Sequence, residues 1–358
     1  MMNCSGGVEN IELLFRYACA YEFRNFTELF HELASHLHAE ALREAHLMRA
    51  QIKLFAADET LMDDLEEAAR MNVAPRFPCL QDRWMPDSPN RFVVFKKKPG
   101  ALRKFLQILP GVGDKLGSWY QESGVAMAHQ MQSEVLYFCG EPGEALALAT
   151  GRCGRKQGHP ADAILSLYVQ FRCHLAMGAQ KEAGECMMEM VRTAEASPEC
   201  QGPYQVVRDW ANLTTGWSGD NPRFYGASRG EALPVLEDRL AAIRKGISRF
   251  SALEEPFVEY AERSNRESYT MRQHYMDIFH ALYWFQVEDR QQAEAYFQRA
   301  YRVSRSSGIV MPFAEYGSQI VPLLRYVEGR DVDCARDWVS TILSLAERYE
   351  QGLQAYRA

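Results

Sequence analysis

The sequence predicts an all-α protein in which pairs of helices repeat and stack into a right-handed solenoid, interrupted by two long irregular loops. Apolar residues recur at three- and four-residue steps along most of the chain, which is the spacing of one helical face. A glycine precedes an alanine by five residues twice, at Gly140–Ala145 and at Gly178–Ala183, and these two units are 38 residues apart. A fixed period of this length is typical of stacked helical repeats. With 47% hydrophobic residues among 358, the chain can fill the interior of such an array.

The clearest helix pair spans residues 269–308, where two amphipathic segments flank a polar turn at 287–290. The apolar face of the first segment consists of Tyr275, Ile278, Phe279, Leu282 and Phe285. The second carries a stripe of small and aromatic residues, Ala293, Phe297 and Ala300. This order resembles the tetratricopeptide helix pair. The resemblance implies an α-α superhelix, because such a pair cannot bury its apolar faces without stacked neighbours.

We expect a single helical-repeat solenoid over residues 1–358. Degenerate repeats occupy 1–71, with helices at about 39–55 and again after the cap residues 58–60. Prolines then punctuate a loop at 72–100, with a short extended piece at 91–95, and a long loop of this kind would cap a groove or brace two repeats. Clearer repeats follow at 101–195. They begin with helices at about 101–109 and 115–122, joined by a turn at Gly111-Val112-Gly113.

An irregular segment rich in aromatic residues and glycine is expected at 196–232, after a helix near 204–215. Residues 233–358 then hold the C-terminal repeats. They comprise a long helix at 233–250, the helix pair described above and a helix from Pro312 through Tyr326. A final amphipathic helix at 331–358 would cap the solenoid.

Charge and cysteine content narrow the class of protein. The formal net charge of −7 argues against direct nucleic-acid binding by this chain, because phosphate binding needs clustered Lys and Arg. The nine cysteines are scattered without a CxxC spacing, which favours reduced thiols in a cytoplasmic protein. Neither a signal-peptide pattern nor an apolar run of about 18 residues is visible, so we expect no membrane span.

Sequence patterns for catalysis or metal binding are missing. Histidines 31, 36, 38 and 46 lack the HxxxH and HExxH spacings of metal ligands, so surface histidines are expected. Cysteines 139, 153, 173 and 186 have no chelating spacing, which favours buried free thiols. No GxSxG, kinase or Ser-His-Asp pattern appears. The sequence therefore predicts a protein that is not an enzyme and that has no cofactor and no metal.

Two stretches go beyond generic helix pairs. Residues 293–324 place Gly308 before a short apolar link, Phe313, Glu315, Gly317 and the paired Leu323-Leu324. The second stretch consists of residues 46–71, then the loop at Asp87-Ser88-Pro89, and then residues 131–149. These stretches resemble the MalT-like helical-repeat region of LuxR-family transcriptional regulators. The resemblance implies the regulatory sensor region of a bacterial transcription factor.

Two parts common in that family are missing from the sequence. The segment 111–117, GVGDKLG, has the wrong spacing for a phosphate loop, and no helix-turn-helix signature follows the repeats. We therefore expect either a fragment or a free-standing sensor module, and DNA binding is assigned to no residue.

A candidate binding face follows from the repeat register. Counting back from Ala145 and Ala183 places Gln130 and Glu134 beside Tyr168 and Arg172, on the first helices of neighbouring pairs. In tetratricopeptide stacks these helices line the concave surface. Glu134 and Arg172 occupy equivalent positions, where they could orient a polar ligand or a peptide. Alternatively, they could form a salt bridge between repeats without any ligand.

A second candidate lies in the irregular aromatic segment. Trp210 and Phe224 accompany Trp217, Arg223 and Tyr225, which either contribute to a ligand site or pack beneath a loop. The leading function is a sensor that binds a small effector or partner protein in a concave groove, and a homodimer is compatible with it. The alternative is a free-standing tetratricopeptide-like adaptor that binds a peptide or a partner protein.

Overall fold

The computed structural model describes residues 30–31, 34–37, 39–55, 57–71, 92, 98–151, 160–215, 270–330 and 335–357. All regular structure in these ranges is helical, and they contain no strand. The prediction of an all-α protein is therefore confirmed. The helix expected at 233–250 lies outside the described residues, as does most of the loop at 72–100.

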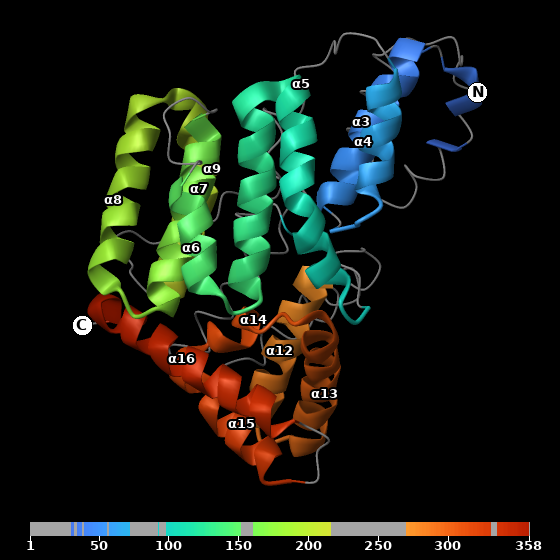
Figure 1. Ribbon diagram of the computed structural model, residues 1–358. Coiled ribbons are helices and arrows are strands. Elements are labelled where there is room, and N and C mark those ends of the chain that lie inside the picture. The colour runs from blue at the N-terminus through green and yellow to red at the C-terminus, as the bar shows by residue number, and fades with distance from the viewer. Residues whose placement is uncertain are drawn as a thin grey trace.

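Helix hairpins stand side by side in the upper part of the molecule (Figure 1). Their helices are α3 (Ala39–Phe55), α4 (Leu61–Arg70), α5 (Ala101–Phe138), α6 (Pro142–Gly151), α7 (Pro160–Ala176) and α8 (Gln180–Ala196). Short η1 (Ala34–His36) precedes them, and η2 (Pro198–Cys200) and α9 (Gln201–Thr215) follow. Each hairpin buries its apolar face against its neighbours, since α6 packs on α7 as well as on α5. The bounds predicted for α3 and the start predicted for α4 are confirmed.

The long α5 corrects one prediction. The helix runs straight through the expected turn at Gly111-Val112-Gly113, where Val112 is fully buried in the core. The chain reverses later: a Cβ built on Gly124 would lie 2.6 Å from the Leu116 carbonyl oxygen. Figure 1 shows α5 doubling back on itself accordingly. Glycine is needed at this reversal because the two legs touch through their backbones.

The C-terminal unit contains the expected hairpin of α12 (Thr270–Gln286) and α13 (Arg290–Ser307). Short pieces follow: α14 (Met311–Ala314), η4 (Gly317–Gln319) and α15 (Val321–Glu328). The single helix predicted from Pro312 through Tyr326 is therefore wrong. It is interrupted at Gly317, which has a positive φ of 56°. The Ser318 amide donates to a Glu350 carboxylate oxygen at 2.9 Å, which compensates for the broken helical hydrogen bonding.

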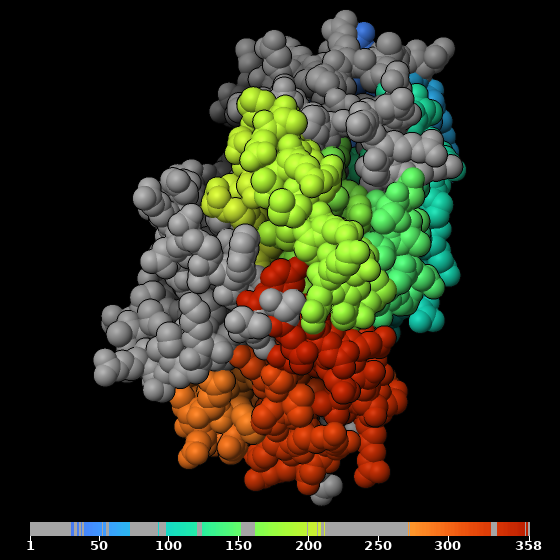
Figure 2. All heavy atoms as spheres, turned by 90° about the vertical axis from the view of Figure 1, so that its left-hand side faces the viewer, coloured from blue at the N-terminus to red at the C-terminus, as the bar shows by residue number. Residues whose placement is uncertain are grey.

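The last helix, α16 (Arg336–Arg357), crosses the lower ends of the hairpins (Figures 1 and 2). It packs on α7, α8 and α9 above and on α14, η4 and α15 below. A Cβ built on Gly352 would lie 2.3 Å from the Leu175 carbonyl oxygen, so α16 and the end of α7 are in backbone contact. The helix thus joins the upper hairpins to the C-terminal unit.

Three hairpin turns share one geometry. Gly140, Gly178 and Glu288 have φ values of 85°, 75° and 67° at the turns α5/α6, α7/α8 and α12/α13. Five residues after each of them stands a fully buried alanine: Ala145, Ala183 and Ala293. The hairpin positions predicted from the Gly–Ala spacing are therefore confirmed, and the same turn recurs where glutamate replaces the glycine.

Candidate ligand and partner site

Arg172 projects from α7 into the interior between the hairpins and the C-terminal unit, and only 3% of its surface is exposed. Its guanidinium carbon lies 4.3 Å from the ring centroid of Tyr137 and 4.7 Å from that of Phe138, both at the end of α5. The ring of Tyr168, one turn earlier on α7, is 5.4 Å away. Aromatic faces attract a cation of this kind, so these rings fix the position of the guanidinium.

The carboxylate of Glu315 neutralises Arg172 from the segment after α14. Arg172 Nη2 donates to Glu315 Oε1 at 2.5 Å, and Tyr137 Oη donates to the same oxygen at 2.7 Å. Tyr275 Oη, from α12, donates to Glu315 Oε2 at 2.7 Å. We call these four residues, Tyr137, Arg172, Tyr275 and Glu315, the Arg172 centre. It links residues that are 143 positions apart in the sequence.

Electrostatics keep the donors of this centre in their donor states. Burial raises the pKa values of Tyr137 and Tyr275, and the negative charge of Glu315 raises them further, so both phenols stay protonated. Burial alone would lower the pKa of Arg172, but Glu315 and the surrounding tyrosines outweigh it and leave this pKa raised. Within the fold, two protonated phenols and a charged guanidinium therefore surround the Glu315 carboxylate.

Glu134, which precedes Arg172 by 38 residues on the preceding hairpin, also binds a group from a distant part of the chain. Its Oε2 accepts a hydrogen bond from the Phe92 amide at 2.8 Å, and its Oε1 accepts one from Gln130 Nε2 at 3.0 Å. The fully buried Phe92 ring lies 5.7 Å from the ring of Phe138. Phe92, which belongs to the predicted 72–100 loop, therefore contacts α5 at Glu134 and Phe138.

Gln130 and Glu134 hydrogen-bond to each other on α5, and Tyr168 and Arg172 lie together on α7, but these four residues do not line an open groove. They are 1–3% exposed, which corrects the expectation of a half-buried concave surface. The ion pair of Arg172 is made with Glu315 from the C-terminal unit. Whether these residues bind a ligand stays a prediction. Trp217, Arg223 and Tyr225 lie outside the described residues, as does the side chain of Trp210.

Sequence reasoning missed the partner of Arg172. Tyr275 was assigned to an apolar helical face, and Glu315 entered only as part of a family pattern. One signal was present: Glu315 is the single charged residue in the stretch 309–317, which is otherwise apolar or small apart from Tyr316. A lone charge in a buried stretch indicates a buried ion pair, because an unpaired charge there would be costly.

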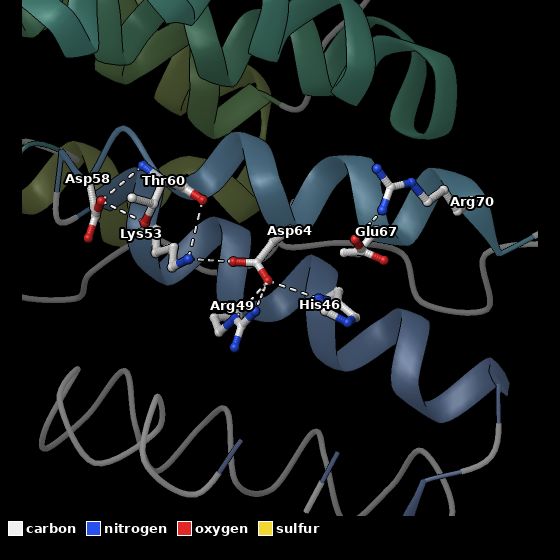
Figure 3. A network of polar contacts seen from close by, with 8 residues as sticks. All are labelled: His46, Arg49, Lys53, Asp58, Thr60, Asp64, Glu67 and Arg70. Atoms are coloured by element: carbon white, nitrogen blue, oxygen red, sulfur yellow. Dashed lines mark hydrogen bonds and ion pairs between the residues drawn. The ribbon is translucent and has the colours of Figure 1, made fainter. Parts of the chain in front are cut away.

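A second polar cluster joins α3 to α4 around Asp64, which is fully buried (Figure 3). Asp64 Oδ1 lies 2.9 Å from His46 Nδ1 and accepts from Arg49 Nε at 2.7 Å, while Lys53 Nζ is 2.8 Å from Oδ2. Burial raises the pKa of Asp64, but hydrogen bonds from the three basic residues outweigh it and lower this pKa to about 2. His46 is buried, contrary to the predicted surface location.

The described cysteines fit the prediction of free thiols. Cys139, Cys173, Cys186 and Cys200 form no disulfide, and burial raises the pKa of Cys139 to about 12 and that of Cys186 to about 11. Neutral thiols of this kind are weak nucleophiles. No group of three His, Cys, Asp or Glu side chains with metal-binding geometry occurs in the described ranges. Cys153 lies outside them.

Comparisons with known proteins identify no relative: no family model, curated protein or solved structure matches the chain. None of the helices in the described ranges is both long enough and apolar enough to cross a membrane.

Proposed function

We propose that this chain is a tetratricopeptide-like helical-repeat module that regulates by binding and not by catalysis. Its role would be that of the sensor region of a LuxR-type transcriptional regulator. The observation that carries the proposal is the Arg172 centre, a complete recognition site for a carboxylate placed where the hairpins meet the C-terminal unit. The shared turn geometry of three hairpins supports the repeat architecture. The regulator assignment rests on the sequence resemblance at residues 293–324.

The Arg172 centre also suggests how an effector would act. Arg172 and the hydroxyls of Tyr137 and Tyr275 all serve one carboxylate, that of Glu315. An effector with its own carboxylate would compete with Glu315 for these donors, because charge-assisted hydrogen bonds recognise the group and not the chain that carries it. Binding would then change how the C-terminal unit docks on the hairpins. A ligand shifts such an equilibrium only through its different affinities for the two arrangements.

A free-standing adaptor that binds a peptide is the second candidate function. It is favoured by the way α5 holds Phe92. Glu134 accepts a hydrogen bond from the Phe92 backbone amide, and the Phe92 ring lies beside the ring of Phe138. A peptide from another protein would offer the same two groups. In this case the partner would replace Phe92 on the α5 face.

Native mass spectrometry of the intact purified protein separates these functions. A sensor should retain a small molecule as a fixed mass increment, which Arg172→Met should remove. The matched control is Arg192→Met, which changes an exposed arginine that is paired with Glu189 on α8. An increment that survives Arg172→Met would exclude the Arg172 centre as its site. A wild-type protein without any increment would favour the adaptor.

A further inference from the structure

Apart from the Arg172 centre, the structure contains a second group of basic residues, which lie in a row along one side of α3. Arg43, His46, Arg49 and Lys53 follow one another at steps of three or four residues, and we call this row the basic stripe. Figure 3 shows that its last three members converge on Asp64 of α4. Arg43 precedes His46 by three residues, which is about one helical turn.

Arg43 differs from the other members of the stripe because it is buried and forms no ion pair with any residue that the structure describes. Only 1% of its surface is exposed, and its buried Nε and Nη1 atoms have no hydrogen-bond partner among the described residues. A guanidinium group stays protonated at any physiological pH, so burial cannot neutralise it. An unpaired buried charge is strongly destabilising, and a buried polar group that lacks a partner points to a missing water, ion or ligand.

The nearby carboxylate does not meet this demand. Asp64 Oδ1 is bound by His46 and Arg49, and Oδ2 is ion-paired with Lys53 Nζ at 2.8 Å, although it has no hydrogen-bond partner among the described residues. Arg43 forms no ion pair with any described residue. Its helix neighbour Glu44 is buried too, but adjacent helix positions point in directions about 100° apart and do not face each other.

We propose that Arg43 and the adjoining basic stripe form a binding site for a small oxyanion. The ligand chemistry is an inorganic phosphate, or the phosphate or carboxylate group of a small molecule. Charge-assisted hydrogen bonds from Arg43 would hold it, and His46 is the nearest member of the stripe. The site lies on α3 and stands independently of the function proposed for the Arg172 centre.

Thermal unfolding of the full chain at constant ionic strength tests the site, with chloride replaced stepwise by phosphate or by acetate. The wild-type midpoint should rise and saturate with one of these anions, since a ligand of the folded state stabilises by mass action. Arg43→Met should melt above wild type in chloride and show no anion-dependent rise. Arg192→Met, the exposed control, should behave like wild type. Phosphate and acetate arms separate the two ligand chemistries.

Two results would overturn the proposal. One is an equal, unsaturating rise in all three proteins, which is the general effect of an excluded salt. The other is titration calorimetry of wild type that detects saturable heat with neither anion, a result that does not depend on whether Arg43→Met folds. Arg43→Lys, which keeps the charge, should bind the same anion at least about ten-fold more weakly.

Discussion

At the scale of single residues, buried charges are the chemical feature that most distinguishes this molecule. Asp64, Arg172, Glu134 and Arg43 are each at most 3% exposed. Asp64 is neutralised by partners on α3 and Arg172 by Glu315 just after α14, and a carboxylate or guanidinium in the interior survives only with such partners. The consequence is that pH and single substitutions act on the whole fold through these few atoms.

The Asp64 cluster predicts a loss of stability in acid. The pKa of Asp64 is about 2 in the folded protein and 3.8 without the fold, so the folded state binds the proton less readily. The resulting stabilisation, about 2 kcal/mol, is present above pH 3.8 and disappears as the pH falls towards 2. Asp64→Asn should therefore lower the urea midpoint at pH 6, and its difference from wild type should shrink near pH 2.

The control for this prediction is Asp63→Asn, on the same helix but exposed. It should leave the urea midpoint within about 0.5 kcal/mol of wild type at every pH. If the urea midpoint of Asp64→Asn stayed below that of wild type by the same amount from pH 6 to pH 2, the stability lost in acid could not be assigned to this carboxylate.

The Arg172 centre predicts strong coupling between two distant residues. Arg172→Met removes the cation that pairs with the buried Glu315 carboxylate, and Glu315→Gln removes the anion that pairs with the buried guanidinium. Each change should cost roughly 3–5 kcal/mol in the free energy of unfolding. The double variant should lose much less than the sum, because it buries no unpaired charge. Urea denaturation of the four proteins measures this, and additive losses would show that the ion pair is not a unit.

At the scale of helices and turns, the three hairpin turns are chemically unequal. Gly140 and Gly178 adopt the left-handed conformation without cost, whereas Glu288 adopts it at φ 67° with a side chain. Glu288 is exposed, so its side chain contributes no buried packing there. The third turn is therefore strained relative to the other two.

Glu288→Gly should relieve this strain and stabilise the protein by roughly 1 kcal/mol. The reverse change at the equivalent position, Gly178→Ala, should destabilise it by a similar amount. A Cβ at Gly178 would have its nearest neighbours at 3.6 Å, so the effect would come from the backbone and not from a collision. Thermal melts of both variants test the pair, and opposite signs are required.

Local spacing predicted much of this architecture, and its limits are physical. The Gly140 and Gly178 turns, α3, α4 and the α12/α13 hairpin follow from contacts between residues close in sequence. The reversal of α5 was misplaced because Pro110, Gly111 and Gly113 all favour a break, yet tertiary burial of Val112 keeps the helix intact. For the candidate site, the sequence singled out Arg172 and Glu134, which are both buried and bind groups from distant segments. Their partners Glu315 and Phe92 come from distant segments that no local period connects to them.

At the scale of the whole molecule, α16 decides how the upper hairpins and the C-terminal unit fit together. It was expected to cap one end of a stack, but it runs beneath the hairpin turns and touches both parts. The contact is closest at Gly352, against the backbone of Leu175. Because the Arg172 centre spans the same junction, the two parts should unfold as one cooperative unit.

Gly352→Ala tests this cooperativity. The added Cβ would lie 2.3 Å from the Leu175 carbonyl oxygen, so α16 must move away from α7, at a cost of roughly 1–3 kcal/mol. Gly202→Ala, a helical position in α9 with no atom within 4 Å of the new Cβ, is the matched control and should be neutral or slightly stabilising.

Hydrogen exchange of Gly352→Ala, followed by mass spectrometry, should then show faster exchange in α7 and in α14 and α15 together, because α16 packs on all of them. Faster exchange confined to α16 would mean that the two parts are stable separately and that the Arg172 centre does not couple them.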